Sequence, residues 1–361
     1  MRRGAPDSMS ERKRIIYVHK GASSFVKNDQ RILEAVFDVR VIAFLPKSKW
    51  KVPFLLVRML FSLLREVPRA DAVVCQFAGH HALLPIILAR LFGKRSVVIS
   101  NGSDCVGFPS LNYGHFRKRL LAWSTRTCFR LCDRIVPLDA SLVHHVPTYH
   151  DIDPPAQGIK YFCPGLKTPI TVLGYGFDPE QWRAKGERLP KRFITVASGA
   201  HQPSVQVLKG LDMILQVAPR FPDAEFVIVG AHEGSFPTKP ANVKEIPFVP
   251  HDRITTWYGS ATYYLQLSVS EGFGNALCEA MLCGCIPIVS NTGAMPAIVG
   301  GTGYIVLRRD VDVLERTIRD AMLHAAPQGP EAMRERIMHY YPVALRATGL
   351  PDIVTEAIDR P

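Results

Sequence analysis

Residues 270–281 read SEGFGNALCEAM, and this stretch decides how the second half of the chain folds. A β-rich run at 263–267 precedes it and a helical run at 275–283 overlaps its end, so the stretch forms the turn between a strand and a helix. Its two glycines let the backbone come close to a ligand. The free N–H groups and the dipole of the first helical turn suit a diphosphate, so we expect an anion at this turn.

Two carboxylates and an amide belong to the same stretch. Glu279 lies eight residues after Glu271 and four residues after Asn275, so Asn275 and Glu279 share one face of the predicted helix. A carboxylate can accept hydrogen bonds from two hydroxyl groups at once, as ribose or a hexose would require. The stretch therefore predicts a ligand that carries both phosphate and sugar hydroxyl groups.

Short β-rich runs alternate with helical runs on both sides of this stretch. In the first half we predict strands at 14–19, 39–44, 72–76, 96–100, 134–137 and 170–173, and helices at 27–35, 53–66, 81–92, 116–131 and 141–145. In the second half we predict strands at 193–197, 225–230, 244–248, 263–267 and 286–290, and helices at 210–218, 253–260, 275–283 and 313–324. This alternation is typical of the α/β class. We predict two Rossmann-like parallel-sheet domains facing a cleft, with the ligand beyond the carboxyl ends of the strands.

The length of 361 residues is ample for two domains. Residues 1–13 are expected to form a disordered tail, followed by a first domain at 14–180. Gly and Pro residues punctuate the segment 174–190, which is the predicted linker. A second domain covers 185–330, and residues 331–361 form a helical tail that we expect to pack back on the first domain.

The net charge is +12, and the whole excess lies in residues 1–180, which hold 26 Lys and Arg against 14 Asp and Glu. A field of this size attracts nucleic acid, anionic lipid headgroups or phosphorylated substrates, although a merely basic soluble surface explains it equally well. Two apolar runs interrupted by arginines, 52–67 and 83–92, suit either a membrane surface or a helix packed on a sheet. Neither is long enough to span a membrane.

The eight cysteines are scattered and mostly lie in apolar surroundings. The first 14 residues are charged and the apolar run after them is short, so no secretory signal is visible. Free thiols in a reducing cytoplasm fit these features best. Cys128 and Cys132, with His144 and His145 further on, match no zinc-site spacing, and we expect structural cysteines.

The chain resembles the retaining nucleotide-sugar glycosyltransferases of family 4 (glycosyl transferases group 1), which have the GT-B fold. Glu271 and Glu279 match the paired-glutamate E-x7-E motif of that family. The resemblance extends over nearly all of the second half, through residues 195–199, 209–210, 222–230 and 248–261. It is fainter in the first half, where it rests on 20–42, 97–104 and 172–182.

The resemblance implies a role for most of these residues. Glu271 would hold the hydroxyl groups of the transferred sugar, Glu279 would bind the ribose, and Lys209 would neutralise the departing diphosphate. Gly21 would approach the diphosphate from the first domain, and Val249 would lie near the base. Contacts with the sugar and the phosphates would come from the backbone N–H groups of Gly272, Phe273, Gly274 and Asn275.

Two departures from the family pattern concern the same site. Asn101 stands in the first domain where the family often has a histidine, and an amide can hydrogen-bond a sugar hydroxyl group but cannot accept a proton at neutral pH. Ser198 and Gly199 stand where the family commonly has an arginine, and we expect Ser198 to contact the nucleotide-sugar donor. For a retaining transfer the departing diphosphate itself can accept the proton of the incoming hydroxyl group.

The implied function is a metal-independent transfer of a hexose from a nucleotide-diphosphate sugar to a saccharide or a lipid-linked saccharide, with retention of configuration. No resident cofactor or metal is expected. The first domain would be the basic acceptor side and the second would bind the donor. The setting would be cell-surface polysaccharide or lipopolysaccharide biosynthesis, in the cytoplasm and peripherally on the inner face of the plasma membrane.

Other functions stay open at this point. A nucleotide-sugar epimerase uses a similar cleft, and a nucleic-acid-binding or membrane-binding protein with little turnover would explain the charge, although no nucleic-acid recognition module appears. The Asp-x-Asp of a metal-dependent transferase occurs at 151–153, but its surroundings indicate a loop. A dehydrogenase fingerprint and a P-loop are both missing from the sequence.

Overall fold

The computed structural model describes residues 12–21, 23–46, 48–152, 154–324 and 329–360. The first domain is built on a parallel sheet with the strand order β2-β1-β3-β4-β7. Its strands are β1 (Arg14–His19), β2 (Asp38–Ala43), β3 (Ala72–Gln76), β4 (Arg95–Ser100) and β7 (Arg134–Pro137). The central strand β3 is buried along its whole length, as expected for a parallel strand covered by helices on both faces.

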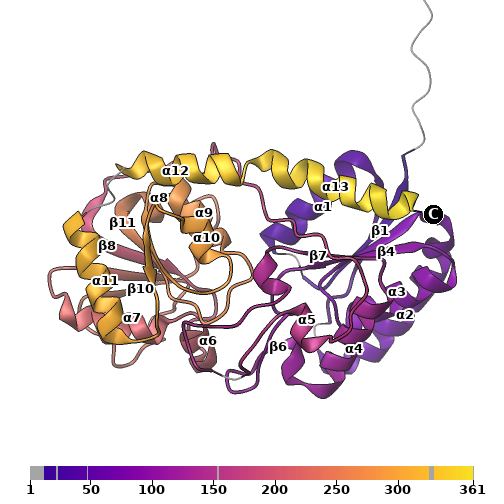
Figure 1. Cartoon of the computed structure of the whole chain (residues 1–361), viewed down its shortest axis with the longest axis horizontal. Helices are drawn as coiled ribbons and strands as arrows, with labels where there is room; N and C mark the ends of the chain where they lie inside the picture. Colours follow the sequence, from indigo (N-terminus) through magenta and orange to yellow (C-terminus); the bar gives the residue numbers. More distant parts are fainter. Residues whose placement is uncertain (1–11, 22, 47, 153, 325–328, 361) are drawn as a thin grey trace, which may run out of the picture.

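The helices of the first domain follow its strands in sequence. They are α1 (Ser24–Val36), α2 (Val52–Glu66), α3 (His80–Leu91), α4 (Arg119–Leu131) and the short α5 (Ile159–Phe162). A small hairpin of β5 (Gly107–Phe108) and β6 (Tyr113–Gly114) extends from the carboxyl end of β4. In Figure 1, α2, α3 and α4 lie together on the side of this domain away from the C-terminal helices.

The second domain has a parallel sheet in the order β10-β9-β8-β11-β12-β13. Its strands are β8 (Leu189–Val196), β9 (Glu225–Val229), β10 (Val243–Ile246), β11 (Ala261–Gln266), β12 (Ile286–Ser290) and β13 (Tyr304–Val306). Its helices are α6 (Pro203–Leu208), α7 (Leu211–Val217), α8 (Ile254–Ser260), α9 (Asn275–Leu282), α10 (Met295–Val299) and α11 (Val311–His324). This strand order is that of the dinucleotide-binding Rossmann fold, which places a ligand where the order reverses, between β8 and β11.

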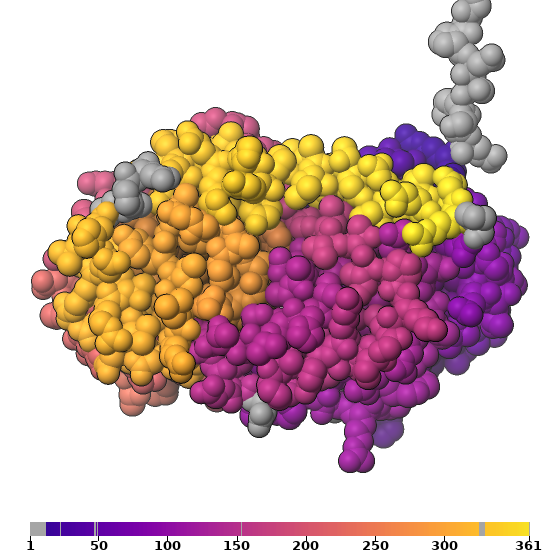
Figure 2. All heavy atoms as spheres, viewed as in Figure 1, coloured from indigo at the N-terminus to yellow at the C-terminus, as the bar shows by residue number. Residues whose placement is uncertain are grey.

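Two C-terminal helices join the domains (Figure 1). α12 (Gly329–Tyr340) packs on α9 of the second domain, and α13 (Val343–Asp359) packs on α1 of the first domain. Leu350 and Val354 of α13 are fully buried in the same apolar cluster as Ile15 of β1. Figure 2 shows the atoms of the two domains meeting along a seam, with these helices crossing above it.

The predicted fold class is confirmed: both domains are Rossmann-like and both sheets are parallel. Two predicted elements are wrong. Residues 170–173 lie beside β7, with a bridge between Ile135 and Ile170 and a hydrogen bond from the Leu173 N–H to the carbonyl oxygen of Pro137, but they form no regular strand, because the chain turns there into the connection between the domains. In place of a helix at 141–145, a single 3-10 turn forms at Ala140–Leu142. Most of the expected tail at 1–13 lies outside the described residues.

The described helices include none with the length and apolar character that crossing a membrane requires.

Candidate functional site

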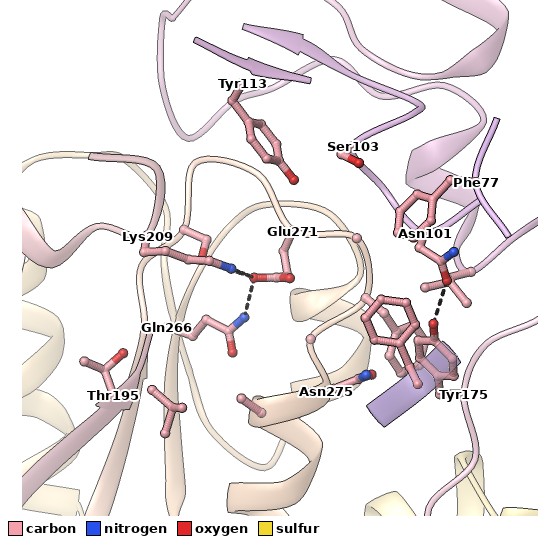
Figure 3. Close-up of a pocket in the computed structure, with 18 residues that line it drawn as sticks. Phe77, Asn101, Ser103, Tyr113, Tyr175, Thr195, Lys209, Gln266, Glu271 and Asn275 are labelled. Carbon is pink, nitrogen blue, oxygen red and sulfur yellow. Dashed lines mark hydrogen bonds and ion pairs between the residues drawn. The ribbon is translucent and has the colours of Figure 1, made fainter. Parts of the chain in front are cut away.

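A cavity of about 260 Å³ lies between the two domains, at the carboxyl ends of both sheets. The first domain contributes Asn101, Ser103 and Tyr113 to its wall, and the second contributes Lys209 and Glu271. Figure 3 shows these side chains converging from the two sides. The location agrees with the position expected for a ligand between two facing Rossmann-like domains.

Glu271 forms several hydrogen bonds within the cavity. Its Oε2 atom accepts hydrogen bonds from Lys209 Nζ at 2.8 Å and from Gln266 Nε2 at 2.9 Å (Figure 3). Burial by itself raises the pKa of Glu271, but the Lys209 ammonium and these hydrogen bonds outweigh burial and lower the pKa below its usual value. Glu271 is therefore held as a carboxylate in a fixed orientation.

Lys209 reaches the cavity because the chain turns sharply behind it. Gly210 has a φ of +67°, and a Cβ atom there would lie 2.2 Å from the carbonyl oxygen of Leu267. Only glycine accommodates both the left-handed backbone and this close approach. The turn places the Lys209 side chain, which is 30% exposed, against Glu271.

Asn101 lies on the opposite wall, after the end of β4. Its Oδ1 atom accepts a hydrogen bond from Tyr175 Oη at 2.6 Å (Figure 3) and another from Gln76 Nε2 at 3.3 Å. Both hydrogen bonds engage the side-chain carbonyl oxygen of Asn101 within the protein. The amide nitrogen of Asn101 donates one hydrogen bond to the carbonyl oxygen of Ile99 at 3.5 Å, and its second N–H is available to donate to a ligand.

The first turn of α9 opens into the cavity. Its N-cap is Gly274, with a φ of 116°, and no side chain caps the helix. The Asn275 Oδ1 atom and the Gln266 Oε1 atom are both buried and have no hydrogen-bond partner within the described chain. Free amides at a helix N-terminus suit phosphate oxygens, and buried acceptors without partners suit hydroxyl donors of a ligand.

Glu279 lines a second cavity, of about 370 Å³, which shares Asn275 with the first. Lys27 and Arg31 of α1 face this second cavity from the other domain. Burial raises the pKa of Glu279 to about 7, although Tyr258 Oη donates a hydrogen bond to it at 3.3 Å. The two glutamates of the E-x7-E motif thus line neighbouring cavities and differ in their electrostatic environment.

The structure brings most of the predicted site residues together. Those that line one or both cavities are Asn101, Lys209, Glu271, Gly272, Phe273, Gly274, Asn275 and Glu279. Gly21, Ser198 and Val249 line neither cavity. Their donor contacts remain predictions.

Several residues of the cavity were not predicted from the sequence. Phe77 and Tyr175 contribute aromatic rings, and Tyr113 reaches the cavity from the β5–β6 hairpin. Burial, followed by the charge of Glu271, raises the pKa of Tyr113, so its hydroxyl group stays protonated. Gln266 is the last residue of β11 and lies near the end of the predicted strand at 263–267, so the rule that ligands bind at carboxyl ends of strands could have identified it.

The two domains touch beside Glu271. A Cβ atom on Gly272 would lie 2.0 Å from the carbonyl oxygen of Asn101, and one on Gly102 would lie 2.9 Å from the Cα atom of Gly272. Farther along the seam, His150 Nε2 donates to the carbonyl oxygen of Val269 at 3.0 Å. Both domains therefore contribute backbone to the wall of one site.

Across the described ranges, no group of three or more His, Cys, Asp or Glu side chains is placed to hold a metal ion. Asp153, the second carboxylate of the Asp-x-Asp sequence, lies outside those ranges.

Comparison with known proteins agrees with this architecture. Residues 192–324 match the family model described as Glycosyl transferases group 1. A D-inositol 3-phosphate glycosyltransferase of Mycobacterium sp. (strain KMS) is 26% identical over 215 residues, which are 55% of this chain and 44% of that protein. The chain thus matches less than half the length of this curated relative.

Solved structures resemble the chain over nearly its whole length. Anabaena HepE, in complex with UDP and glucose, superposes with a TM-score of 0.67 at 12% identity and covers 95% of this chain and 100% of its own. WaaG, a glycosyltransferase involved in lipopolysaccharide biosynthesis, gives 0.63 at 14% identity and covers 96% and 100%. The resemblance to glycosyl transferases group 1 is confirmed, and the chain has the GT-B fold.

Proposed function

We propose that this protein transfers a sugar from a nucleotide-diphosphate sugar to a saccharide or lipid-linked saccharide acceptor with retention of configuration. The observation that carries the proposal is the hydrogen-bonded pair of Glu271 and Lys209 near the uncapped N-terminus of α9, in a cavity between two Rossmann-like domains. The sequence match to glycosyl transferases group 1 supports the same function.

The donor would lie across the two adjoining cavities. Sugar hydroxyl groups would donate to Glu271 and to the buried oxygens of Gln266 and Asn275, which have no partner in the described chain. The diphosphate would lie at the α9 N-terminus beside Lys209. Glu279 in the second cavity would accept hydrogen bonds from the ribose. The UDP bound by HepE supports a uridine donor as the first to be tested.

The proposed transfer needs no strong protein base. The bond between the anomeric carbon and the diphosphate oxygen breaks as the acceptor oxygen bonds to the same face of that carbon. The departing diphosphate takes the acceptor proton, and Lys209 and the α9 amides stabilise its charge. Asn101, whose carbonyl oxygen is already occupied by Tyr175, would only orient the sugar or the acceptor through its NH₂ group.

The acceptor side would work at an anionic membrane surface on the cytoplasmic side. The exposed apolar side chains of α2 form the α2 face, which consists of Phe54, Val57, Phe61 and Leu64. Arg58 and Arg65 follow Phe54 and Phe61 by four residues each and therefore flank this face. Apolar side chains flanked by arginines fit an interface between lipid chains and anionic headgroups. A membrane-linked saccharide acceptor would suit polysaccharide or lipopolysaccharide biosynthesis. WaaG, whose fold this chain resembles, is involved in lipopolysaccharide biosynthesis.

A donor panel tests the proposal directly. Uridine, guanosine and adenosine diphosphate sugars are added to the protein, and its melting temperature is recorded. A true donor at about 100 times its Kd stabilises the fold by about 2.7 kcal/mol, and Glu279→Ala should remove most of that gain. A shift that persists in full in Glu279→Ala would refute the ribose assignment.

The same donor separates transfer from epimerisation. Radiolabelled donor incubated without acceptor stays unchanged if the protein is a transferase, apart from slow hydrolysis. Conversion to a second nucleotide sugar under these conditions would favour an epimerase.

A further inference from the structure

A third cavity, of about 500 Å³, opens on the surface of the first domain at the carboxyl ends of β1 and β2. Lys20 and Phe44, which follow directly after these strands, line it. The Lys20 ammonium lies 4.8 Å from the centre of the Phe77 ring, and Phe77 lines the cavity between the domains. The third cavity and the candidate active site therefore adjoin at Phe77.

Phe77 holds its place at some conformational cost. Its φ of 65° lies in the left-handed region, which residues other than glycine seldom adopt. Its backbone N–H donates to the carbonyl oxygen of Ile99 at 2.8 Å, which fixes this conformation. Such strain concentrates at functional sites, where the surrounding structure maintains it.

Lys20 brings a positive charge to the cavity that no carboxylate in the described ranges pairs with at salt-bridge distance. Asp104 is the acidic group that acts on it most directly. The oxygens of Asp104, however, already accept hydrogen bonds from the backbone amides of Ala78 and Asn101. The Lys20 side chain is exposed overall, and partial desolvation of its ammonium group in the cavity lowers its pKa.

Lys20, and not the histidine beside it, carries the positive charge of this cavity. Lys20 Nζ lies 3.1 Å from His115 Nε2, and His115 Nδ1 lies 3.1 Å from Thr125 Oγ1. Burial and the charge of Lys20 lower the pKa of His115 to about 2, so His115 is neutral and its Nε2 accepts from Lys20. The remaining N–H groups of Lys20 are free to donate to a ligand, and His80 at the rim can add another donor.

The other wall of the cavity is apolar. Leu45 and Leu121 line it, and Leu45 is 48% exposed. Beyond Leu121, the exposed side chains of Leu120 and Trp123 continue the apolar surface along α4. A cation with a few N–H donors beside an apolar wall matches a phosphoryl group attached to an apolar chain or to a sugar.

We propose that this Lys20 cavity binds a phosphoryl group of the acceptor, so that the acceptor hydroxyl group extends past Phe77 toward Glu271. The proposal rests on the transferase function inferred above and makes the acceptor a phosphate-bearing molecule. The phosphate can belong to a lipid-linked saccharide or to a soluble sugar phosphate, and both present the same group to Lys20.

Calorimetric titration of the full chain tests the proposal with three probes: inorganic phosphate, dioctanoyl phosphatidic acid and the neutral dioctanoylglycerol. We expect both phosphate probes to bind and the neutral one to bind at least about 10-fold more weakly than dioctanoyl phosphatidic acid. Tighter binding of phosphatidic acid than of inorganic phosphate assigns a lipid-linked source, and equal binding assigns a soluble one. Equal binding of dioctanoylglycerol and phosphatidic acid overturns the proposal.

Variants locate the binding. Lys20→Gln should weaken phosphate binding by about 10-fold or more, whereas the matched change Lys167→Gln, at an exposed lysine of the same domain, should not. Leu45→Glu is an independent variant at a partly exposed position, and its added carboxylate should repel the same probes. Unchanged phosphate binding in both Lys20→Gln and Leu45→Glu refutes the site.

A donor titration keeps the two proposals separate. Loss of phosphate binding in Lys20→Gln, together with a donor-induced melting shift as in the unmodified protein, supports both. Lack of any donor shift in the unmodified protein refutes the transferase proposal, whatever the phosphate probes do.

Discussion

Glu271 and Glu279 belong to one motif, yet the fold gives them opposite pKa shifts. Lys209 and Gln266 hold the pKa of Glu271 below its usual value, whereas burial raises that of Glu279 to about 7. Carboxyl groups whose surroundings separate their pKa values commonly have different tasks. Glu271 stays ionised at neutral pH, and Glu279 changes charge there.

Glu279 should make the stability of the protein depend on pH. In the folded protein Glu279 keeps its proton up to about pH 7, whereas the unfolded chain releases it near the ordinary value of 4.5. The free energy of unfolding should therefore fall as the pH rises from about 4.5 to about 7, by at most about 3 kcal/mol. Urea denaturation across this range should show this fall, and Glu279→Gln should remove that part of it. Identical pH profiles for the two proteins would contradict the prediction.

Lys209 should matter more to the chemical step than to donor binding. Its charge lies where the proposed diphosphate would gain negative charge, and removing one such stabilising group typically costs about 100- to 1000-fold in kcat. We expect Lys209→Gln to lose activity on this scale in initial-rate measurements. Lys191→Gln, at an exposed lysine of the same domain, serves as the control, and equal activity of both variants would exclude the role.

At the scale of elements, α13 is fastened to the first domain by a buried ion pair. Arg346 of α13 forms two hydrogen bonds to Asp29 of α1, at 2.6 and 2.7 Å, and its side chain is 1% exposed. Asp29 also accepts a hydrogen bond from Gln76, which in turn donates to Asn101. The C-terminal helix is thus connected to the wall of the candidate active site.

Breaking this pair should destabilise the protein strongly. Arg346→Ala leaves Asp29 charged and buried, which typically costs about 3–5 kcal/mol. Denaturation in guanidinium chloride should show that loss, whereas Arg183→Ala, which removes an exposed pair with Glu180, should change stability by less than about 1 kcal/mol. The double variant Asp29→Leu with Arg346→Met should recover much of the loss. A loss of under 1 kcal/mol in Arg346→Ala would contradict the account.

The sequence predicted the strands and helices that have a clear hydrophobic periodicity. It missed the elements whose formation depends on residues distant in the sequence. Buried runs such as residues 72–76 and the E-x7-E stretch identified the sheets and the donor side. The strand β13 and the β5–β6 hairpin are only two or three residues long, so they carry no periodic signal. Tyr113 and Tyr175 enter the site through such irregular segments, and only the assembled fold brings them to Glu271.

For the whole molecule, the contact between Gly102 and Gly272 determines how closely the domains approach. Gly272→Ala would place a Cβ atom 2.0 Å from the carbonyl oxygen of Asn101, so the seam has to open. We expect a larger radius of gyration in X-ray solution scattering and a loss of transfer activity of about 10-fold or more, since small displacements of reacting groups are costly. Gly301→Ala is the control, because no atom lies within 4 Å of the Cβ position there. Unchanged scattering and activity in Gly272→Ala would show that the contact is not required.

The α2 face should control membrane association. Arg58→Glu with Arg65→Glu replaces attraction to anionic headgroups by repulsion, at about 1 kcal/mol for each basic residue near the surface. Sedimentation with vesicles of phosphatidylglycerol and phosphatidylcholine should show binding that weakens with salt and is lost in this double variant. Arg183→Glu with Lys185→Glu makes the same charge change in the segment between the domains. Equal vesicle binding by both double variants would remove the membrane from the proposed function.

The chain returns from the second domain to the first through α12 and α13, and this return limits how the molecule can be divided into separate domains. The peptide crosses between the domains twice, and the two crossings lie side by side, where the Phe177 N–H donates to the carbonyl oxygen of Tyr341 at 2.9 Å. A protease that cuts only within 174–190 would therefore leave the halves attached through the second crossing. A recombinant fragment ending at residue 173 would lack the helix that buries Ile15 and Leu33, and we expect it to aggregate. A soluble half-molecule would require residues 343–360 to be joined back onto the first 173.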